Sequence, residues 1–385
     1  MKDSFIDLNK VGEGTFGSVY RAKDKETGEQ VALKMIKLER EKEGFPITAI
    51  REIKILRALK QAGNIAENSI VDLREIVTSD NTKDVSEESA DNDTTGAAAS
   101  RGADTAETQT RGGVYLVFEY LEYDLKGLLD AGVTLTKKHV MCYMKQLLEG
   151  VHYMHRQKIL HRDLKLSNLL IGSNGQLKIA DWGLARSWND NVKAYTNKVI
   201  TLWYRPPELL LGDTQYTCAI DMWSVGCIFA ELLNKKAPMT GNQEIQQLQH
   251  IWALCGTPTK ESWPGVDRLK HWETFKPAQQ QPSRIRSRFK SFDSFALDLV
   301  EKLLTLNPNK AKDSPGWMEK QKGPPEPPYR MTAEEALDHN YFWQPNEMPL
   351  SPHKLVGQVG RFKVGSAHEW EAREHKRNRG LAQAQ

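Results

Sequence analysis

His161-Arg162-Asp163-Leu164-Lys165-Leu166-Ser167-Asn168 is the most informative run of residues in this chain. It places an acid, a cation and an amide at fixed spacing, so that one loop can hold a base, a phosphate contact and a metal ligand. Thirteen residues later, Asp181-Trp182-Gly183 follows the apolar run Leu177–Ala180. A carboxylate there suits Mg²⁺, which prefers carboxylates together with substrate phosphates. Any one of these acids alone would be interpreted as solvated surface, but the ordered set favours a catalytic site.

A glycine-rich stretch lies near the start of the chain, Gly12-Glu13-Gly14-Thr15-Phe16-Gly17-Ser18-Val19. Glycines let backbone amides approach phosphate oxygens without a Cβ in the way. The same spacing occurs in dinucleotide-binding folds and in ordinary turns. A dinucleotide loop would open a helix, whereas this one lies between two predicted strands, which favours a flap that covers phosphates.

A lysine and a glutamate further along could form a buried ion pair. Val31-Ala32-Leu33-Lys34 ends an apolar strand, and Lys34 by itself is most simply a solvated edge residue. In the helix predicted at about Ile47–Lys60, however, Glu52 lies near the middle of the apolar face, where a carboxylate is costly unless paired with a cation. Lys34 is an available partner, and such a pair positions phosphates in kinases.

The other side of the same helix carries Ile47 and Ile50 among basic residues. Isolated exposed aliphatic residues are ordinary in globular proteins. Two of them on the back of a helix whose front is already apolar also fit a surface for a partner protein. The pattern alone leaves both interpretations open.

Composition and patterning indicate an α+β protein. The 385 residues carry a formal net charge of +3, with 27% charged and 39% hydrophobic residues, the balance of a globular protein. Residues 4–38 alternate as three antiparallel strands, further strands are predicted near Ile70–Thr78 and Val114–Glu119, and the pattern is helical from Lys137 onward. A β-rich part followed by a helical part predicts two lobes.

Several observations bear on compartment. No apolar run approaches membrane-spanning length and no secretory signal is visible at the start, so no membrane association is expected. The four cysteines are scattered without metal-ligand spacing, which is typical of reduced thiols in the cytosol or nucleus.

Two inserts and a tail interrupt the pattern. Residues 79–111 contain 8 acidic and 3 basic residues and no aromatic one, which predicts a disordered surface loop. Residues 311–329 contain five prolines and predict a stiffer loop. The tail from 353 to 385 carries 7 basic and 3 acidic residues; it is either solvated disorder or an aid to nuclear import or nucleic-acid proximity. No specific nucleic-acid binding is expected.

With these features, the chain resembles a eukaryotic protein kinase, and within that family a cyclin-dependent kinase. The likeness runs from about Phe5 to Trp343 without the two inserts. It rests on the following motifs: PITAIRE at 46–52, DWGLAR at 181–186, VITLWYRPPE at 199–208 and DMWSVGC at 221–227. The first and third are most similar to the transcription-elongation branch, the animal elongation kinases and plant C-type cyclin-dependent kinases. The resemblance implies a bilobal kinase fold: N-lobe and hinge at 1–121, C-lobe at 122–343 and a basic tail at 344–385.

The resemblance also implies a site for ATP and Mg²⁺. Asp163 would accept the proton of the substrate hydroxyl, with Lys165 and Thr201 supporting Asp163 and the γ-phosphate. Lys34, paired with Glu52, would hold the α- and β-phosphates. Asn168 and Asp181 would bind Mg²⁺. The implied nucleotide contacts are Val11, Gly12, Gly14, Gly17, Val19 and Ala32 in the N-terminal strands, Phe118, Glu119 and Leu121 at the hinge, and Asp124 and Leu170 beyond it.

Regulation and specificity follow from the same resemblance. Thr196 would be phosphorylated by an activating kinase, and Arg51, Arg162 and Arg186 would hold its phosphate, as a multi-arginine clamp that orders a loop would. Val199 would shape a pocket for a proline after the target residue. Ile47 and Ile50 would contact a cyclin of the elongation type, K- or T-like. Glu208 would pair with Arg330.

The sequence therefore predicts a cyclin-activated, proline-directed serine/threonine kinase. Its expected substrates carry Ser/Thr-Pro sites, as in the RNA polymerase II C-terminal repeat or elongation factors. A nuclear location is expected, with a cytoplasmic pool also allowed. One alternative is a cell-cycle or splicing-associated kinase. Phe16 and the motif at 46–52 argue against the cell-cycle role, because cell-cycle members carry a phosphorylatable tyrosine at the position of Phe16. The other is a pseudokinase scaffold, against which the complete catalytic set argues. Trp182, where most kinases have Phe, is expected to change how its segment moves.

Overall fold

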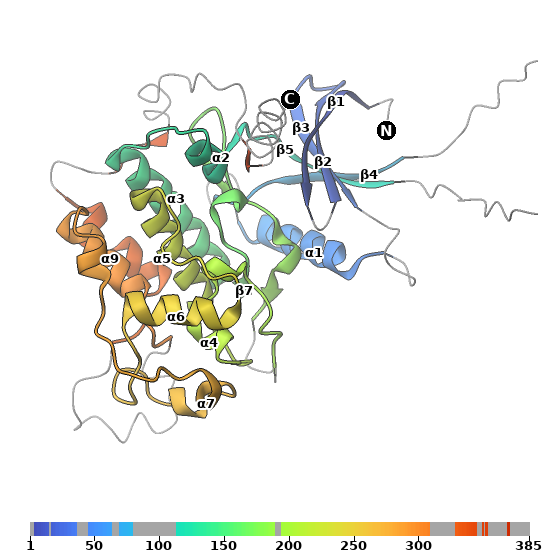
Figure 1. Ribbon diagram of the computed structural model, residues 1–385. Helices are drawn as coiled ribbons and strands as arrows, with labels where there is room; N and C mark the ends of the chain where they lie inside the picture. The colour runs from blue at the N-terminus through green and yellow to red at the C-terminus, as the bar shows by residue number, and fades with distance from the viewer. Residues whose placement is uncertain are drawn as a thin grey trace, which may run out of the picture. The chain divides into compact units, whose positions relative to one another are not determined.

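The computed structural model describes residues 4–14, 17–36, 45–63, 69–79, 113–188, 194–308, 328–344, 349, 351–352 and 368–369 (Figure 1). Two compact units divide the chain: unit 1 comprises residues 1–44 and 74–118, and unit 2 comprises residues 45–73 and 119–385. Phe16 and most residues of both inserts and of the basic tail lie outside the described residues. The predictions made for them therefore stay predictions.

Unit 1 is built on a five-stranded sheet in the order β1-β2-β3-β5-β4. The strands are β1 (Phe5–Gly14), β2 (Gly17–Asp24), β3 (Gln30–Ile36), β4 (Leu73–Thr78) and β5 (Val114–Glu119). The first three pair antiparallel, which confirms the three strands predicted from residues 4–38. Ser79, the first residue of the acidic insert, donates its amide to the Gly113 carbonyl at 2.8 Å, so the chain enters the insert beside the residue that leads into β5.

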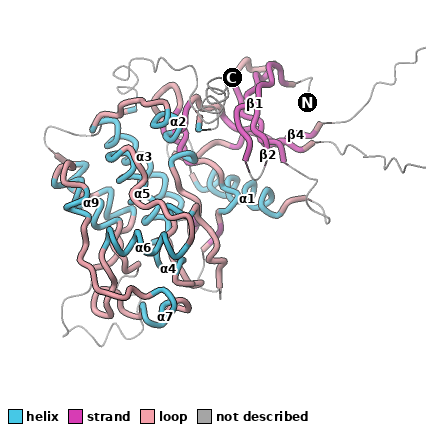
Figure 2. Tube along the Cα trace, viewed as in Figure 1, coloured by secondary structure: helices cyan, strands magenta, loops and turns pink. Residues whose placement is uncertain are grey.

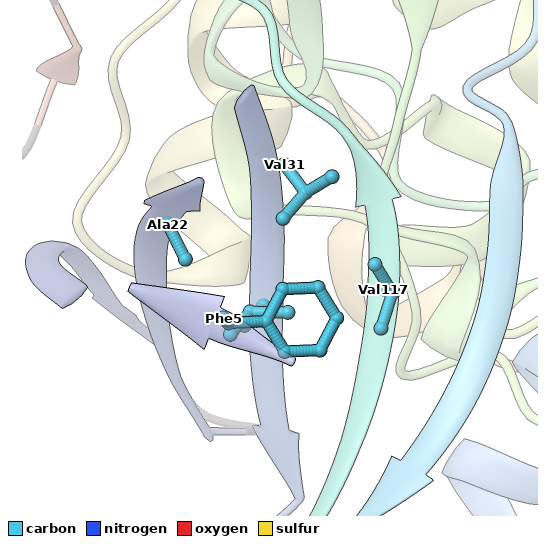
Figure 3. Close-up of a cluster of buried hydrophobic side chains, with 5 residues drawn as sticks. Phe5, Ala22, Val31 and Val117 are labelled. Atoms are coloured by element: carbon cyan, nitrogen blue, oxygen red, sulfur yellow. The ribbon is translucent and has the colours of Figure 1, made fainter. Parts of the chain in front are cut away.

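One face of this sheet carries the hydrophobic core of unit 1. Phe5, Ala22, Val31, Leu33 and Val117 pack there from four strands, each at most 2% exposed (Figure 3). Side chains alternate between the two faces of a strand. The residues between the core positions, among them Ala32 and Lys34 on β3, therefore belong to the opposite face.

Unit 2 is mainly helical and contains the helix α1 (Ile47–Ala62), as Figure 2 shows by colour. The longer helices are α3 (Lys137–Arg156), α5 (Ala219–Asn234), α6 (Glu244–Cys255) and α9 (Ser294–Leu303). The short helices are α2 (Leu125–Asp130), α4 (Pro207–Leu210), α7 (Trp272–Phe275), α8 (Ile285–Arg288) and α10 (Ala333–Leu337), with 3-10 turns η1 (Leu166–Asn168), η2 (Trp182–Leu184), η3 (Leu202–Tyr204), η4 (Val266–Arg268) and η7 (Asn340–Phe342). The short strands are β6 (Tyr123–Asp124), β7 (Ile159–Leu160), β8 (Leu169–Ile171), β9 (Leu177–Ile179) and β10 (Arg186–Ser187).

Helix α1 groups with unit 2, although the sequence placed it in the N-terminal lobe. It packs against η2, and the Tyr153 hydroxyl of α3 donates to the Leu59 carbonyl at 2.6 Å. Lys60 forms an ion pair with Asp72 at 2.6 Å. The chain passes between the two compact units after residues 44, 73 and 118, so α1 and the hinge from residue 119 onward both belong to unit 2. The lobe boundaries implied by the resemblance stay a prediction.

The buried helix α5 anchors the loop that carries Asp163. The Asp221 carboxylate, fully buried, accepts from the backbone amides of His161 at 3.1 Å and Arg162 at 2.9 Å. It also contacts His155 Nε2 at 2.9 Å. A buried carboxylate needs such partners, since an unpaired one is expensive. Asp221 thereby fixes the loop backbone just before the predicted base.

A second buried acid, Glu208, pairs with an arginine far away in the sequence. Glu208 and Arg330 form a two-pronged ion pair, at 2.6 and 3.0 Å, with both side chains almost fully buried. This confirms the pairing that the resemblance implied. The Arg330 amide also donates to the Asn307 carbonyl at 2.8 Å, so the two flanks of the proline-rich insert meet.

Within the described part of the chain, no helix has the length and apolar character needed to cross a membrane.

Candidate active site

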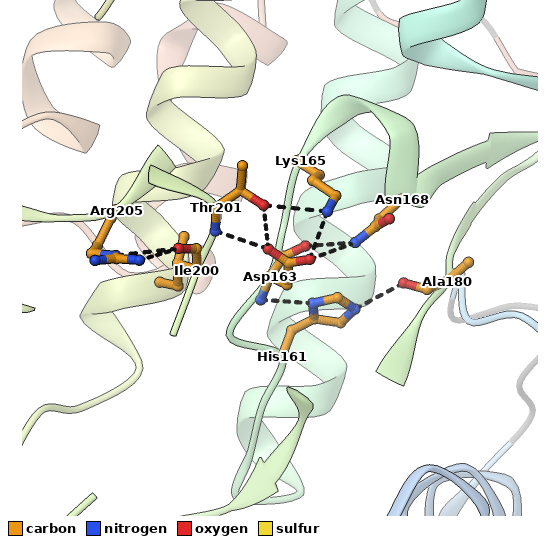
Figure 4. Close-up of polar contacts among 8 residues, drawn as sticks. All are labelled: His161, Asp163, Lys165, Asn168, Ala180, Ile200, Thr201 and Arg205. Carbon is orange, nitrogen blue, oxygen red and sulfur yellow. Dashed lines mark hydrogen bonds and ion pairs between the residues drawn. The ribbon is translucent and has the colours of Figure 1, made fainter. Parts of the chain in front are cut away.

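The Asp163 carboxylate is the centre of the site in unit 2, and it is 6% exposed. Its Oδ1 accepts from the amide of Thr201 at 3.0 Å and from the Thr201 hydroxyl at 2.8 Å. Its Oδ2 accepts from Lys165 Nζ at 2.8 Å and from Asn168 Nδ2 at 3.3 Å. Four donors thus match the roughly four lone-pair sites of an ionised carboxylate. Figure 4 shows how they converge from the loop and from the segment of Thr201.

The His161 side chain connects this loop to the residue that follows β9. Its Nδ1 accepts from the Asp163 amide at 3.3 Å, so its Nε2–H donates to the Ala180 carbonyl at 3.0 Å (Figure 4). One acceptor and one donor are what a neutral imidazole offers. Burial lowers the pKa of His161, although nearby carboxylates, Asp221 first among them, oppose that shift. The histidine is therefore a fixed neutral bridge between the loop and the end of β9.

The two predicted Mg²⁺ ligands come from segments joined by a backbone hydrogen bond. The Ala180 amide donates to the Asn168 carbonyl at 2.9 Å, which joins the residue before Asp181 to η1. Asn168 Nδ2 donates to the Asp163 carbonyl at 2.8 Å. Figure 4 shows that the side-chain oxygen of Asn168 takes no part in these bonds to Asp163. Asp181 has φ 61°, a left-handed conformation that aspartate tolerates. An amide oxygen and a carboxylate are hard ligands that fit Mg²⁺.

Trp182, the unusual residue after Asp181, is fully buried. Its indole N–H donates to the Ile179 carbonyl at 3.1 Å, and its ring stands edge-on to His161 at 4.7 Å. The larger ring therefore has a defined packing site in this conformation. Whether it alters the movement of the segment stays a prediction.

The segment around Thr196 carries the predicted phosphate clamp. Thr196 is exposed, as a modification site must be. Burial lowers the pKa of Arg51, and the like charges of Arg186 and Arg162 lower it further. The charges of Arg162 and Arg186 thus act on Arg51 within unit 2. Their role as a phosphate clamp stays a prediction.

The substrate side of the site includes a residue that the sequence did not reveal. Val199 is buried, as expected for a pocket wall, but the next residue, Ile200, has φ 69°. A positive φ is a genuine outlier for a β-branched residue. The Arg205 guanidinium holds it there by donating from Nε and Nη2 to the Ile200 carbonyl, at 3.2 and 3.1 Å. No pattern in the sequence signalled this strain, because β-branched residues disfavour a positive φ.

In unit 1, the described glycines of the glycine-rich stretch lie on the paired ends of β1 and β2. Gly12 pairs with Val19, and Gly14 with Gly17. A Cβ on Gly17 would lie 1.8 Å from the Met35 carbonyl oxygen, so only glycine fits. The stretch leads into a strand and not a helix, which excludes the dinucleotide-binding alternative.

Lys34 lies directly across from Val19 on the neighbouring strand, so the predicted nucleotide contacts Val19, Ala32 and Lys34 share the sheet face opposite the core. Val11 lies one residue before Gly12 on β1, and Phe118 is buried on β5. Lys34 belongs to unit 1 and Glu52, which is 3% exposed, to unit 2. Burial of Glu52 confirms its place on the apolar face, and its pairing with Lys34 stays a prediction.

The hinge residues are held by a polar network within unit 2. Glu119 Oε1 accepts from the Asp72 amide at 2.8 Å, and the Glu119 amide donates back to the Asp72 carbonyl at 3.1 Å. The buried Lys178 lies 4.0 Å from the same carboxylate. The hinge residue Leu121 is buried. Beyond the hinge, Leu170 pairs with Asp124 across β8 and β6.

The tail contributes residues near this hinge that the sequence did not assign to the site. The Glu369 amide donates to Asp124 Oδ2 at 2.8 Å, and His368 Nδ1 lies 3.4 Å from the same oxygen. Asp124 Oδ1 accepts from the Gly127 amide at 2.7 Å and begins α2. Both oxygens of this predicted nucleotide contact are thus engaged. The composition of the tail gave no signal for this contact.

The exposed face of α1 agrees with the partner interpretation but does not test it. Ile47 is 67% exposed and Ile50 is 38% exposed, whereas Ile55 and Leu59 on the opposite face are buried. The sequence therefore distinguished the two faces correctly.

Comparison with known proteins agrees with this geometry. The protein kinase domain family matches residues 5–313. The chain is similar to cyclin-dependent kinase C-1 of Oryza sativa subsp. japonica, with 45% identity over 97% of this chain and 64% of that protein. It is 41% identical to cyclin-dependent kinase 12 of Caenorhabditis elegans, over 96% of this chain and 47% of that protein. It is 42% identical to cyclin-dependent kinase 9 of Danio rerio, over 87% of this chain and 80% of that protein. The chain thus spans about two thirds of the rice relative and about half of the nematode one.

Proposed function

Because the chain belongs to the protein kinase family, and within it to the cyclin-dependent kinases, we propose that it phosphorylates serine and threonine residues followed by proline. ATP is the phosphate donor, and a cyclin activates the chain. The observation that carries this proposal is the Asp163 carboxylate held by Thr201, Lys165 and Asn168.

Asp163 acts as the base for the substrate hydroxyl. The hydroxyl oxygen forms a bond to the γ-phosphorus, the bond between that phosphorus and the β–γ bridging oxygen breaks, and ADP leaves with the electron pair. The hydroxyl proton passes to Asp163. Since four donors already occupy this carboxylate, the substrate hydroxyl must replace one of them. The Thr201 hydroxyl can yield most easily, because it rotates freely and also accepts from Lys165 at 3.2 Å.

Nucleotide and metal binding draw on residues that suit them chemically. Asn168 and Asp181 hold Mg²⁺, which neutralises phosphate charge when bound. That only two protein ligands are proposed fits the general habit of Mg²⁺ sites, in which phosphates and waters complete the shell. Lys34, paired with Glu52, and the amides of the glycine-rich hairpin hold the phosphates.

The strained backbone at Ile200 supports the preference for proline. Its carbonyl is occupied by Arg205, so it is not available to accept an N–H from the residue after the target. A residue with an N–H would lose a hydrogen bond to water on binding there, whereas proline has no N–H to lose. Val199 forms a wall of the pocket.

The elongation branch and the partners are the finer part of the proposal. The motifs at 46–52 and 199–207 and the plant and animal relatives support a K- or T-like cyclin at Ile47 and Ile50 and activation by phosphorylation of Thr196. Substrates are then Ser-Pro repeats of the RNA polymerase II tail or elongation factors, and the location is nuclear. Imaging a chain truncated before residue 353 tests whether the basic tail directs it there.

A peptide kinase assay tests the proposal. The purified chain with its cyclin is given a Ser-Pro repeat peptide or histone H1. Preference for the repeat peptide is expected; preference for histone H1 would indicate the cell-cycle alternative.

Asp163→Asn is expected to abolish transfer while ATP still binds. Asp267→Asn, in an exposed ion pair with Lys260, serves as control and keeps full activity. Full transfer by Asp163→Asn would refute the assigned base, and no turnover by the unaltered complex would indicate a scaffold.

A further inference from the structure

Arg162 is the most buried member of the predicted phosphate clamp. It is 3% exposed, and its backbone has φ 66°, fixed by the bond from its amide to Asp221. Its guanidinium already makes two directed bonds. Nε donates to the Leu184 carbonyl at 2.8 Å, and Nη1 donates to the Tyr216 hydroxyl at 2.9 Å. A guanidinium held at two points has a set orientation.

The Tyr216 hydroxyl continues the chain of hydrogen bonds to the segment of Thr196. It donates to the Thr196 carbonyl at 2.8 Å. A phenol has one proton to give, and here it goes to Thr196 while the oxygen accepts from Arg162. One hydroxyl therefore connects the arginine to the backbone of the residue that is to carry the phosphate.

The ring of Tyr216 supports the same segment by packing. Its centroid lies 5.2 Å from that of Tyr195, and Arg186 lies over the Tyr195 ring at 5.8 Å. The Tyr195 amide donates at 2.8 Å to the carbonyl of Thr214, two residues before Tyr216 in the chain. Two of the three clamp arginines are thus in contact with the Tyr195–Tyr216 pair.

We propose that Tyr216 is a positioning residue for activation: its hydroxyl holds the Thr196 backbone against an already oriented Arg162, so that a phosphate on Thr196 meets the arginines without further rearrangement. The inference rests on the proposed function, because it assumes that phosphorylation of Thr196 activates the chain. Tyr216 touches neither substrate nor nucleotide in this role. It acts through Arg162 and Thr196.

The competing interpretation is that Tyr216 only fills the core, since it is 3% exposed. Tyr216→Phe separates the two, because it keeps the ring and removes only the hydroxyl. The variant is made in the Thr196-phosphorylated chain and in Thr196→Ala, each with cyclin. Tyr143→Phe, a buried tyrosine on α3, is the matched control.

If Tyr216 positions the clamp, Tyr216→Phe lowers the transfer rate of the phosphorylated chain by roughly tenfold, the effect of losing one hydrogen bond to a charged group. In Thr196→Ala the same change has little effect. Equal losses in both backgrounds, or no loss in either, would overturn the proposal. Tyr143→Phe is expected to show no dependence on Thr196.

Amide hydrogen exchange of unphosphorylated chains gives a readout that needs no activity. Tyr216→Phe is expected to speed exchange in a peptide covering residues 194–198 and not in one covering α3. Unchanged exchange at 194–198 would contradict the bond to Thr196. If the unaltered phosphorylated complex transfers no phosphate, the proposed function fails, and this measurement still decides the role of Tyr216.

Discussion

His161 shows how much one neutral side chain contributes to the geometry of the site. It joins the Asp163 amide to the Ala180 carbonyl, and its ring packs on Trp182. A protonated imidazole would have no lone pair left for the Asp163 amide. The fold therefore keeps this histidine neutral, in line with its lowered pKa.

This makes stability depend on pH. An unfolded histidine titrates near 6.5. Below that pH the unfolded chain binds a proton that the folded chain refuses, so the contribution of His161 is complete above about 6.5 and declines as the pH falls through it. The free energy of unfolding, measured by urea denaturation, is expected to drop from pH 7.5 to 5.5, by at most about 1.4 kcal/mol per pH unit from this residue.

His161→Gln is expected to show a smaller drop over the same range. His139 and His339, whose pKa values burial also lowers, titrate in both proteins and so cancel in the comparison. An equal pH dependence in the two proteins would count against a neutral His161.

The sequence identified site residues that belong to a motif, but not a residue whose role depends on an unusual backbone conformation. The sequence identified Asp163, Lys165, Asn168 and Thr201, and the structure brings them together. It did not identify Ile200, because a left-handed φ at a β-branched residue contradicts local preference and is imposed by Arg205.

At the scale of elements, α1 has one buried apolar face and one exposed face that carries Ile47 and Ile50. The 3.6-residue period predicted both faces correctly, since it depends only on the spacing of side chains. It could not predict that the helix would group with unit 2, because that depends on contacts such as Tyr153 with Leu59, far apart in sequence. The inner face stabilises the unit, and the outer face is available for a partner.

Charge on the outer face is expected to weaken cyclin binding without unfolding the chain. Ile47→Glu or Ile50→Glu would force a carboxylate into an apolar interface, where an unpaired charge is costly. A pull-down with the cyclin is expected to lose most of the bound chain. Ile245→Glu on α6, at a residue 45% exposed, is the matched control and should bind normally. Undiminished binding by both α1 variants would place the cyclin elsewhere.

At the scale of the whole molecule, buried ion pairs connect segments that are distant in sequence. The motif resemblance predicted Glu208 with Arg330, although 122 residues separate them. The contact of residues 368–369 with Asp124 was not predictable, because neither residue forms part of a pattern in the tail. Long-range contacts were thus accessible only where a motif marked both partners.

Removing one partner of the buried pair is expected to destabilise unit 2 strongly. Arg330→Met leaves Glu208 as an unpaired buried charge and should lower the free energy of unfolding by about 3–5 kcal/mol. Adding Glu208→Leu should restore much of that loss, since an apolar pair no longer needs neutralising. Chemical denaturation measures both. Lys276→Ala, in an exposed pair with Glu273, is the control and should change the free energy of unfolding by less than about 1 kcal/mol. If Arg330→Met lowered the free energy of unfolding no more than this control does, the buried pair would contribute little to stability.

The Glu208–Arg330 pair also has a consequence for the chain while it is being synthesised. Glu208 leaves the ribosome 122 residues before its partner, a delay of roughly 6 to 24 seconds at ordinary rates of translation. During that interval the helices around Glu208 cannot bury it in their final arrangement without an uncompensated charge. The native burial of Glu208 in unit 2 therefore has to wait until Arg330 has been synthesised.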